Sequence, residues 1–192
     1  MMSHSKSRSQ SEILTNRRQF VTRAAALCGF LGSATSLPVL GDTFSPTRSL
    51  RFVHTHTGEM LTAPYFDGGV YSDTCLIMVN SLLRDFRTGE SHQIDPSLLD
   101  ILYEVQTLAN HDAPFEVISG YRSPKTNAML HTHSSGVAEH SQHLLGKAID
   151  VRLSGYSTRA LSAYARSLSR GGVGFYASSD FVHLDTGSVR FW

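Results

Sequence analysis

The sequence has almost no cysteine and no marked excess of charge of either sign. Its 192 residues include 2 cysteines, and 17 basic side chains against 16 acidic ones give a formal net charge of +1. Proteins that bind nucleic acids normally gather Lys and Arg on one face, so this balance argues against a nucleic-acid partner. The apolar content and length suffice for one ordinary domain with its own core.

The N-terminal segment lacks charge over a long stretch. After the paired arginines of NRRQFV (residues 16–21) and after Arg23, no charged residue occurs until Asp42. A basic head followed by a short apolar run rich in Ala, Gly and Leu is typical of a twin-arginine export signal, here residues 1–41. A retained membrane anchor is the alternative, but Gly, Ser and Pro interrupt the run. We therefore predict export by the twin-arginine machinery to the periplasm, with no stable membrane span after cleavage.

Removal of this signal would leave Cys75 without a partner for a disulfide within the chain. Cys28 could instead carry a lipid, but the bulky Leu27 stands before it, where a lipoprotein signal has a small residue. Cys75 lies in an apolar run, where a lone cysteine is more often part of a core than a nucleophile. Thiol catalysis is the alternative to test.

A polar linker is expected over residues 42–49, followed by one folded domain over residues 50–192. Helices are expected from capping residues and helical periodicity, from Asp73 to about Phe86, after Asp95-Pro96, after Ser123-Pro124, and from about Ser157 to Ser169. A hairpin with a Thr-Gly turn is expected over residues 50–65, and further strands are expected in residues 114–119, 147–153, 171–176 and 180–186. Helices gather early and strands late, so the predicted class is α+β with a central, mostly antiparallel sheet flanked by helices.

The segment SQHLLGKAID, from Ser141 to Asp150, holds a histidine and an aspartate that could serve one site. Strand alternation turns Asp150 away from its aliphatic neighbours, and Gly146 permits a turn that folds His143 back over the strand. His183 in the last strand is the candidate third ligand. Two imidazoles and one carboxylate suit a divalent ion such as zinc and leave a coordination position open for water. From spacing alone, hydrogen-bonded core histidines are an equally good interpretation.

The complete pattern Ser-x-His-x-x-Gly-x-Ala-x-Asp resembles the zinc motif of the D-alanyl-D-alanine peptidases related to VanX and to the hedgehog zinc domain. The segments FEVISGYRSPKTNAML, SSGVAEHSQHLLGKAIDVRL and GGVGFY...DFVHLDTG are similar to the YcbK-type murein endopeptidases in particular, as is the twin-arginine leader. The resemblance extends to Trp192. It implies a hedgehog/D-Ala-D-Ala-peptidase-like fold and one zinc ion per chain, held in the domain of residues 50–192 by His143, Asp150 and His183.

The same resemblance implies roles for the residues around the metal. Asp180 matches the general base, although relatives of VanX have a glutamate there; Asp185 is the alternative base, or it could orient His183. Arg122 of the GYRS segment would pair with a substrate carboxylate or stabilise the developing oxyanion, since its forked donors suit either task. Ser141 would form a hydrogen bond with the substrate.

These features imply a zinc-dependent peptidoglycan endopeptidase that cuts cross-linked stem peptides at bonds involving D-amino acids. A D,D- or L,D-carboxypeptidase is one alternative, because the pocket walls that separate these activities are not visible in the sequence. A non-catalytic, zinc-containing module that binds the cell wall is the other. Asp180 argues against that module, since a pure binding protein needs no general base.

Overall fold

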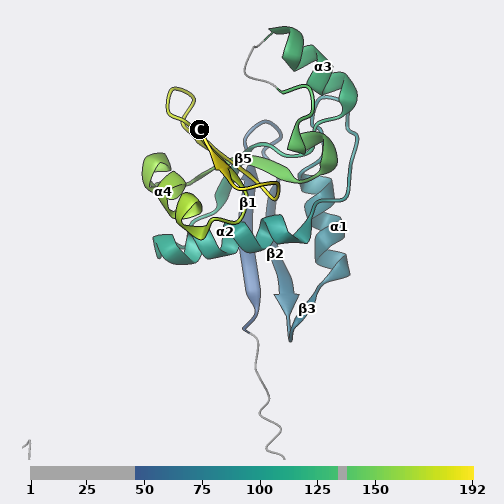
Figure 1. Cartoon of the computed structure of the whole chain (residues 1–192). Coiled ribbons are helices and arrows are strands. Elements are labelled where there is room, and N and C mark those ends of the chain that lie inside the picture. The colour runs from purple at the N-terminus through teal and green to yellow at the C-terminus, as the bar shows by residue number, and fades with distance from the viewer. Residues whose placement is uncertain (1–45, 134–137) are drawn as a thin grey trace, which may run out of the picture. The chain divides into compact units, whose positions relative to one another are not determined.

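The computed structural model describes residues 46–133 and 138–192, so the predicted export signal and the first half of the predicted linker lie outside the described residues. Within these two ranges, eight strands form one sheet in the order β3-β2-β1-β4-β5-β7-β6-β8 (Figure 1). The strands are β1 (Arg48–His54), β2 (Met60–Asp67), β3 (Val70–Tyr71), β4 (Phe115–Ser119), β5 (Ala148–Leu153), β6 (Gly172–Tyr176), β7 (Phe181–Asp185) and β8 (Arg190–Phe191). Five neighbouring pairs are antiparallel, and two, β1 with β4 and β6 with β8, are parallel. The class is therefore α+β with a mixed sheet.

The helices of the described ranges are α1 (Asp73–Leu82), α2 (Pro96–Ala109), α3 (Pro124–His133), the 3-10 helix η1 (Gln142–Leu145) and α4 (Thr158–Leu168). Side-chain oxygens cap several of them, as expected: Asp95 accepts a hydrogen bond from the Ser97 amide, and Ser157 accepts one from the Ala160 amide. In Figure 1, α2 crosses in front of β1 and β2, α4 packs beside α2, and α3 projects at the top.

The first helix differs from its prediction at both ends. Ser72, not Asp73, is the N-cap, because its side chain accepts a hydrogen bond from the Cys75 amide. The helix ends at Leu82 instead of about Phe86. The carbonyl of Leu83 accepts a hydrogen bond from the Tyr121 amide at 2.8 Å, which ties this turn to the end of β4.

The first strand also begins earlier than expected, because the predicted linker ended at residue 49 whereas β1 starts at Arg48. The Arg48 guanidinium pairs with Asp100 at 2.7 Å and lies over the Phe66 ring, with its centre 4.6 Å from the ring centroid. These contacts hold the start of β1 against α2 and β2.

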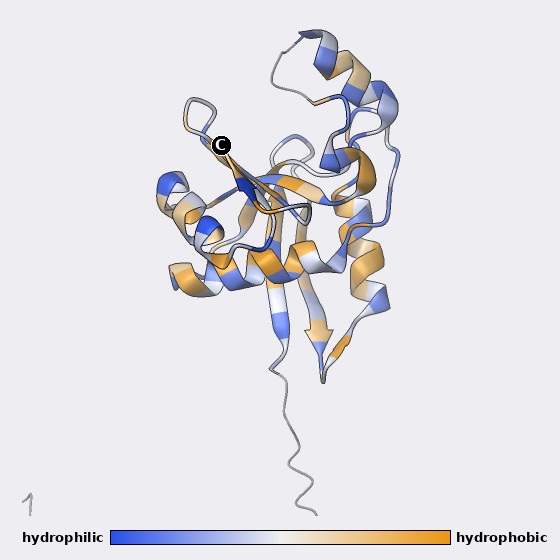
Figure 2. Cartoon of the chain, in the orientation of Figure 1, coloured by the Kyte–Doolittle hydropathy of each residue, from blue (hydrophilic) through white to orange (hydrophobic). Residues whose placement is uncertain are grey.

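The core lies on one face of the sheet, under the amphipathic helices. Figure 2 shows apolar and polar residues alternating along α2, whose Leu98, Leu102 and Val105 are fully buried. Val151 of β5 pairs with Val182 of β7, and both are fully buried as well. Alternation along these two strands therefore sends the intervening side chains to the opposite face, where the polar site is built.

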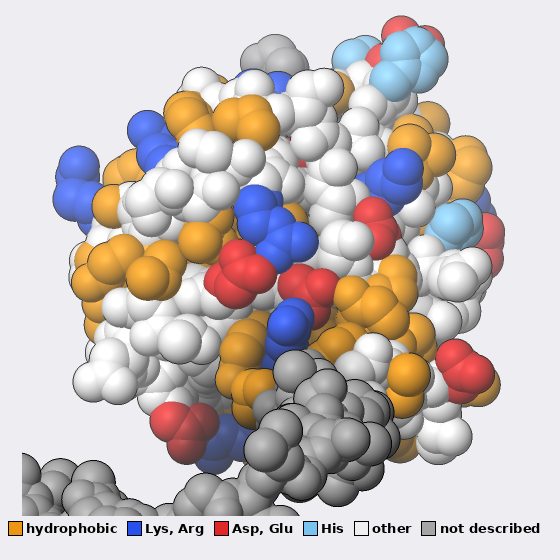
Figure 3. Space-filling view, turned by 60° about the horizontal axis from the view of Figure 1, so that its bottom comes forward, with side chains coloured by type: hydrophobic (Ala, Val, Ile, Leu, Met, Phe, Trp, Pro, Cys, Tyr) orange, Lys and Arg blue, Asp and Glu red, His pale blue; other side chains and the backbone are white. Residues whose placement is uncertain are grey.

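The structure also bears on the predictions about thiol chemistry and a membrane anchor. Cys75 is buried in α1, and burial raises the pKa of its thiol, which disfavours the reactive thiolate. Among the helices of the described ranges, none has the length and apolar character needed to cross a bilayer. On the face shown in Figure 3, basic and acidic side chains lie next to one another instead of gathering by sign.

Candidate metal centre

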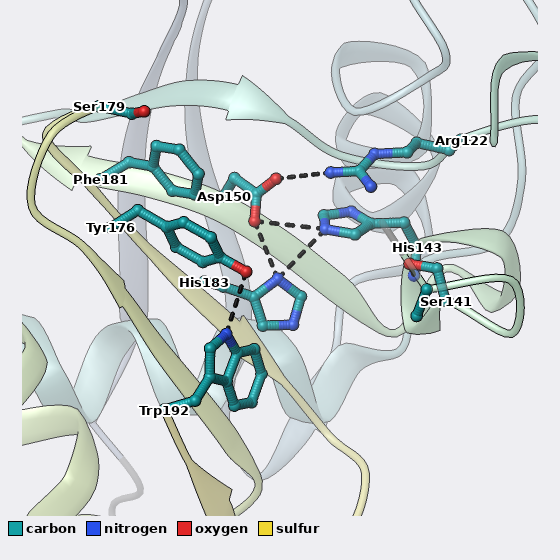
Figure 4. A pocket seen from close by; sticks show the side chains of 10 residues that line it. Arg122, Ser141, His143, Asp150, Tyr176, Ser179, Phe181, His183 and Trp192 are labelled. Carbon is teal, nitrogen blue, oxygen red and sulfur yellow. Dashed lines mark hydrogen bonds and ion pairs between the residues drawn. The ribbon is translucent and has the colours of Figure 1, made fainter. Parts of the chain in front are cut away.

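The structure brings His143, Asp150 and His183 together from three different elements (Figure 4). Asp150 of β5 and His183 of β7 are direct partners across two antiparallel strands. His143 comes from η1, which Ser141 caps at its start and Gly146 ends at a φ of 65°. A Cβ at Gly146 would lie 2.1 Å from the carbonyl oxygen of Gln93, so this turn has room only for glycine.

The candidate ligand atoms are close enough to share one ion. The Nδ1 atom of His183 lies 2.8 Å from Oδ1 of Asp150, and Nε2 of His143 lies 3.3 Å from the same oxygen. The two imidazole nitrogens are 3.2 Å apart, and candidate atoms of all three residues lie within 4.8 Å of one another. All three side chains are buried.

Hydrogen bonds on the far side of each ring fix which nitrogen carries the proton. The Nδ1 atom of His143 donates to the carbonyl oxygen of Gly120 at 2.6 Å, and Nε2 of His183 donates to Oδ2 of Asp185 at 2.9 Å. In a neutral imidazole the other nitrogen is then an acceptor. Two imidazole lone pairs and a carboxylate oxygen therefore point at one place. This arrangement fits a divalent cation, because without a positive charge the three electron-rich atoms would repel one another.

The pKa values of the three groups follow from their burial and from their contacts with one another. Burial lowers the pKa of His143, which keeps that imidazole neutral. Burial alone would lower the pKa of His183, but its hydrogen bonds to Asp150 and Asp185 outweigh this and raise it. Burial alone would raise the pKa of Asp150, but His143 and His183 hold it well below its usual range.

Arg122 lies directly behind Asp150. Its Nη2 atom donates to Oδ2 of Asp150 at 2.7 Å, and its Nε atom donates to the Ser119 hydroxyl at 3.1 Å. The outer carboxylate oxygen is thereby occupied, which leaves Oδ1 facing the two imidazoles. Among the described residues, Nη1 of Arg122 has no hydrogen-bond partner, so one arm of the guanidinium is left for a ligand.

Asp185 lies behind His183 and is held from several sides. Its carboxylate accepts hydrogen bonds from the Gly187 amide at 2.8 Å and from Nη2 of Arg190 at 2.6 Å. Burial alone would raise the pKa of Asp185, but the bonds from His183, Gly187 and Arg190 hold it well below its usual range. A Cβ at Gly172 would lie 2.3 Å from Oδ2 of Asp185, so this glycine of the GGVG segment lets the carboxylate approach β6.

Asp180, the expected general base, is not among the residues that line the pocket. Its carboxylate accepts a hydrogen bond from the Thr158 hydroxyl at 2.5 Å and lies 3.7 Å from the Arg152 guanidinium, with 64% of the side chain exposed. Its φ of 51° is left-handed, a conformation that Asp tolerates better than most residues. These contacts place Asp180 in the turn between Ser179 and Phe181, both of which line the pocket, and its expected role as general base stays a prediction.

A pocket of about 310 Å³ opens over the three candidate ligands. It is lined by Arg122, Ala138, Ser141, His143, Asp150, Tyr176, Ser179, Phe181, His183 and Trp192. Arg122 and Ser141 are thus brought to the site, as the sequence predicts. The aromatic residues Tyr176, Phe181 and Trp192 were not expected. Strand alternation with His183 could have indicated Phe181, but the positions of Tyr176 and Trp192 depend on strand pairing that has no local signal.

Comparison with known proteins gives consistent matches over the same region. A family model described as "Peptidoglycan L,D-endopeptidase MepK" (Peptidase_M15_2) matches residues 43–192. The "Probable peptidoglycan L,D-endopeptidase MepK" of Haemophilus influenzae is 39% identical over 178 residues, which cover 92% of this chain and 95% of the relative. The "Peptidoglycan L,D-endopeptidase MepK" of Escherichia coli K12 is 38% identical over 178 residues, which cover 92% of this chain and 97% of the relative.

Proposed function

Because the chain belongs to the MepK family of peptidoglycan L,D-endopeptidases, the Peptidase_M15_2 metallopeptidases, we propose that it is a zinc-dependent endopeptidase that hydrolyses cross-linked stem peptides of peptidoglycan. The convergence of three buried acceptor atoms at the bottom of a pocket supports this proposal most strongly. The relatives are named for L,D bonds, so we assign this chain the same bond, between an L- and a D-configured residue.

In this proposal Nε2 of His143, Oδ1 of Asp150 and Nδ1 of His183 hold one zinc ion per chain. When bound, zinc supplies Lewis acidity, which lowers the pKa of a water molecule to about 7 and polarises a carbonyl group. The protein contributes the fixed tautomers of the two imidazoles. It also contributes the anchored outer oxygen of Asp150, which Arg122 holds at 2.7 Å. We propose that Asp185 orients His183, the second of the two roles that the resemblance allows.

Arg122 and Ser141 are the proposed substrate-binding residues, since both line the pocket. The Nη2 arm of Arg122 is engaged by Asp150, and Nη1 is the arm left to pair with a substrate carboxylate. Ser141 caps η1 beside His143, which places its hydroxyl at the edge of the candidate metal centre. The expected base role of Asp180 stays a prediction, and a variant described in the Discussion tests it.

We also propose the finer features that the resemblance implies. A ligand from a turn, a ligand from the following strand and a ligand from its antiparallel neighbour support a hedgehog/D-Ala-D-Ala-peptidase-like fold. The paired arginines of residues 16–21 support export by the twin-arginine machinery to the periplasm, where peptidoglycan is accessible. Stem peptides are then the expected partner.

Digestion of purified cross-linked muropeptides tests the proposal. We expect the zinc-loaded protein to convert cross-linked dimers to monomers, detected by mass, and a chelator to stop this reaction. Release of a single terminal residue from monomers, with dimers intact, would indicate a carboxypeptidase instead. Binding of muropeptides without any product would indicate a non-catalytic module and would overturn the enzyme assignment.

A further inference from the structure

We propose that Tyr176 is a further catalytic residue of this site and that Trp192 positions it. In this proposal the Tyr176 hydroxyl donates a hydrogen bond to the carbonyl oxygen of the scissile peptide as negative charge develops there. The proton stays on the tyrosine throughout, so no bond of the protein is made or broken. The inference rests on the proposed peptidase function and adds a donor to it.

Tyr176 lies at the end of β6, directly beside the candidate metal centre. It pairs in register with Phe181 of β7, and the two rings stack with centroids 4.5 Å apart. Figure 4 shows its hydroxyl directed toward His183 and Trp192, on the side of the pocket opposite Arg122. The two polar side chains therefore flank the three candidate ligands from opposite sides.

Trp192 fixes the direction of the Tyr176 hydroxyl group. Its indole Nε1 donates a hydrogen bond to the Tyr176 oxygen at 3.0 Å. An indole N–H can only donate, so the phenolic oxygen is the acceptor in this contact. No hydrogen bond donated by the Tyr176 hydroxyl is found among the described residues, so its hydrogen is available to a ligand in the pocket. Accepting one hydrogen bond also polarises a hydroxyl and makes it a better donor.

The backbone builds a defined place for the Trp192 ring. The Trp192 amide donates to the carbonyl oxygen of Val173 at 3.2 Å, and the Phe175 amide donates to the carbonyl oxygen of Trp192 at 3.0 Å. A Cβ at Gly174 would lie 2.5 Å from Cε2 of the indole, so the absence of a side chain there lets the ring lie flat against β6. The ring centroid is 5.3 Å from that of His183.

The charge distribution of the pocket explains why a second donor is useful. Arg122 donates through Nη2 to Asp150, so its positive charge is partly neutralised on its own side. On the opposite side the lining is formed by Tyr176, Phe181, Trp192 and Ser179, and the Tyr176 hydroxyl is the donor directed toward His183 (Figure 4). A donor fixed in advance by Trp192 needs no reorganisation as charge develops, which is where such a bond contributes most to rate.

Kinetics of Tyr176→Phe on a cross-linked muropeptide test the proposal. Loss of one oxyanion donor should lower kcat by about 100-fold with KM changed by less than about threefold. Tyr103→Phe on α2, outside this pocket, is the matched control and should behave as the wild type. An unchanged kcat would overturn the catalytic role, as would a raised KM at unchanged kcat, which indicates ground-state binding. Zinc content and the thermal midpoint should stay unchanged.

Trp192→Phe tests the positioning role. It removes the indole N–H but keeps a ring, and we expect a kcat reduced by about 10-fold, less than for Tyr176→Phe. In the Tyr176→Phe background the same change should have no further effect on kcat, because the hydroxyl that it orients is already absent. Equal, additive losses in the two backgrounds would overturn the positioning role.

Fluorescence provides a readout that does not depend on activity, because Trp192 is the single tryptophan of the chain. Tyr176→Phe removes the acceptor of the indole N–H and should shift the emission of the metal-free protein, whereas Tyr103→Phe should not. Identical spectra for Tyr176→Phe and the wild type would overturn the contact itself. If the wild type hydrolyses no muropeptide, the proposed function fails, and the fluorescence result still decides the Tyr176 and Trp192 contact separately.

Discussion

The Nε2 atom of His143 and the Nδ1 atom of His183 face each other at 3.2 Å, and neither is the proton-bearing nitrogen of its neutral ring. Two lone pairs at this distance, with the Asp150 carboxylate beside them, are stable only around a positive charge. A proton can supply that charge at low pH, and a divalent ion can supply it at neutral pH.

Metal removal should therefore destabilise the protein. We expect zinc at 100 times its dissociation constant to raise the free energy of unfolding by about 2.7 kcal/mol, and a chelator to reverse this. Thermal unfolding with zinc and with chelator measures the effect. His143→Ala should abolish both the response and the bound zinc, whereas His140→Ala, at an exposed position, should keep them. Equal zinc contents in His143→Ala and the wild type would refute the ligand assignment.

Asp185→Asn should weaken zinc binding while leaving the direct ligands in place. The carboxylate at 2.9 Å keeps the proton of His183 on Nε2, whereas an amide can present a donor there and move the proton to Nδ1, which must bind the metal. Changes of this kind typically cost about 10- to 100-fold in metal affinity. Competition with a chromogenic chelator measures the affinity, and unchanged affinity would show that Asp185 does not orient His183.

Asp180→Asn separates the role implied by the family resemblance from the one indicated by the geometry. If Asp180 is the general base, its replacement should lower kcat by at least about 100-fold while zinc is retained. If the carboxylate only holds the turn through Thr158, zinc content and kcat should instead stay close to those of the wild type. Asn also tolerates the left-handed backbone at this position, so the variant should fold. A fall in kcat of about 100-fold or more would establish Asp180 as the base.

Local sequence signals predicted much of the fold and the metal centre. Asp95, Ser123 and Ser157 precede helices that begin where expected, because capping is decided by residues three or four positions apart. The convergence of two candidate ligands could be predicted because alternation along two strands places Asp150 and His183 on the same face. The Ser-x-His-x-x-Gly-x-Ala-x-Asp pattern of residues 141–150 indicated His143 as the third candidate.

Features that depend on tertiary pairing were not predictable in this way. Tyr176 and Trp192 meet because β8 pairs in parallel with β6, and nothing in the residues between them indicates that pairing. Gly174 is needed for the same reason, since only the folded sheet brings the indole ring above it.

Activity should fall as the pH decreases, because protons compete with the metal for the two imidazoles. Burial lowers the pKa of His143, so His143 resists protonation, whereas the carboxylates around His183 raise its pKa and make His183 the first to take up a proton. Because the pKa of His183 is raised, at limiting zinc we expect hydrolysis to begin to decline above the ordinary imidazole pKa of about 6.5 and to fall further as the pH decreases. Added zinc should move this decline to lower pH. A flat profile down to about pH 4 would contradict the prediction.

Asp85 should give the domain an acid-sensitive contribution to stability next to the site. This buried carboxylate accepts hydrogen bonds from the Ser123 amide at 2.9 Å and the Ser123 hydroxyl at 2.7 Å, and so fixes the residue that follows Arg122. Burial alone would raise the pKa of Asp85, but hydrogen bonds from Thr126, Ser123 and Arg87 outweigh this and lower it to about 2. A depressed pKa means that the folded state favours the ionised form.

The contribution is therefore fully present above the unfolded-state pKa near 4 and is lost as the pH falls through about 2. It amounts to about 2 kcal/mol. Urea unfolding of Asp85→Asn should show this loss at pH 7, and the difference from the wild type should shrink as the pH approaches 2. Asp112→Asn, whose side chain is 93% exposed, is the control and should cost little at any pH. A deficit in Asp85→Asn that stays constant from neutral to acid pH would show that ionisation of this carboxylate does not stabilise the fold.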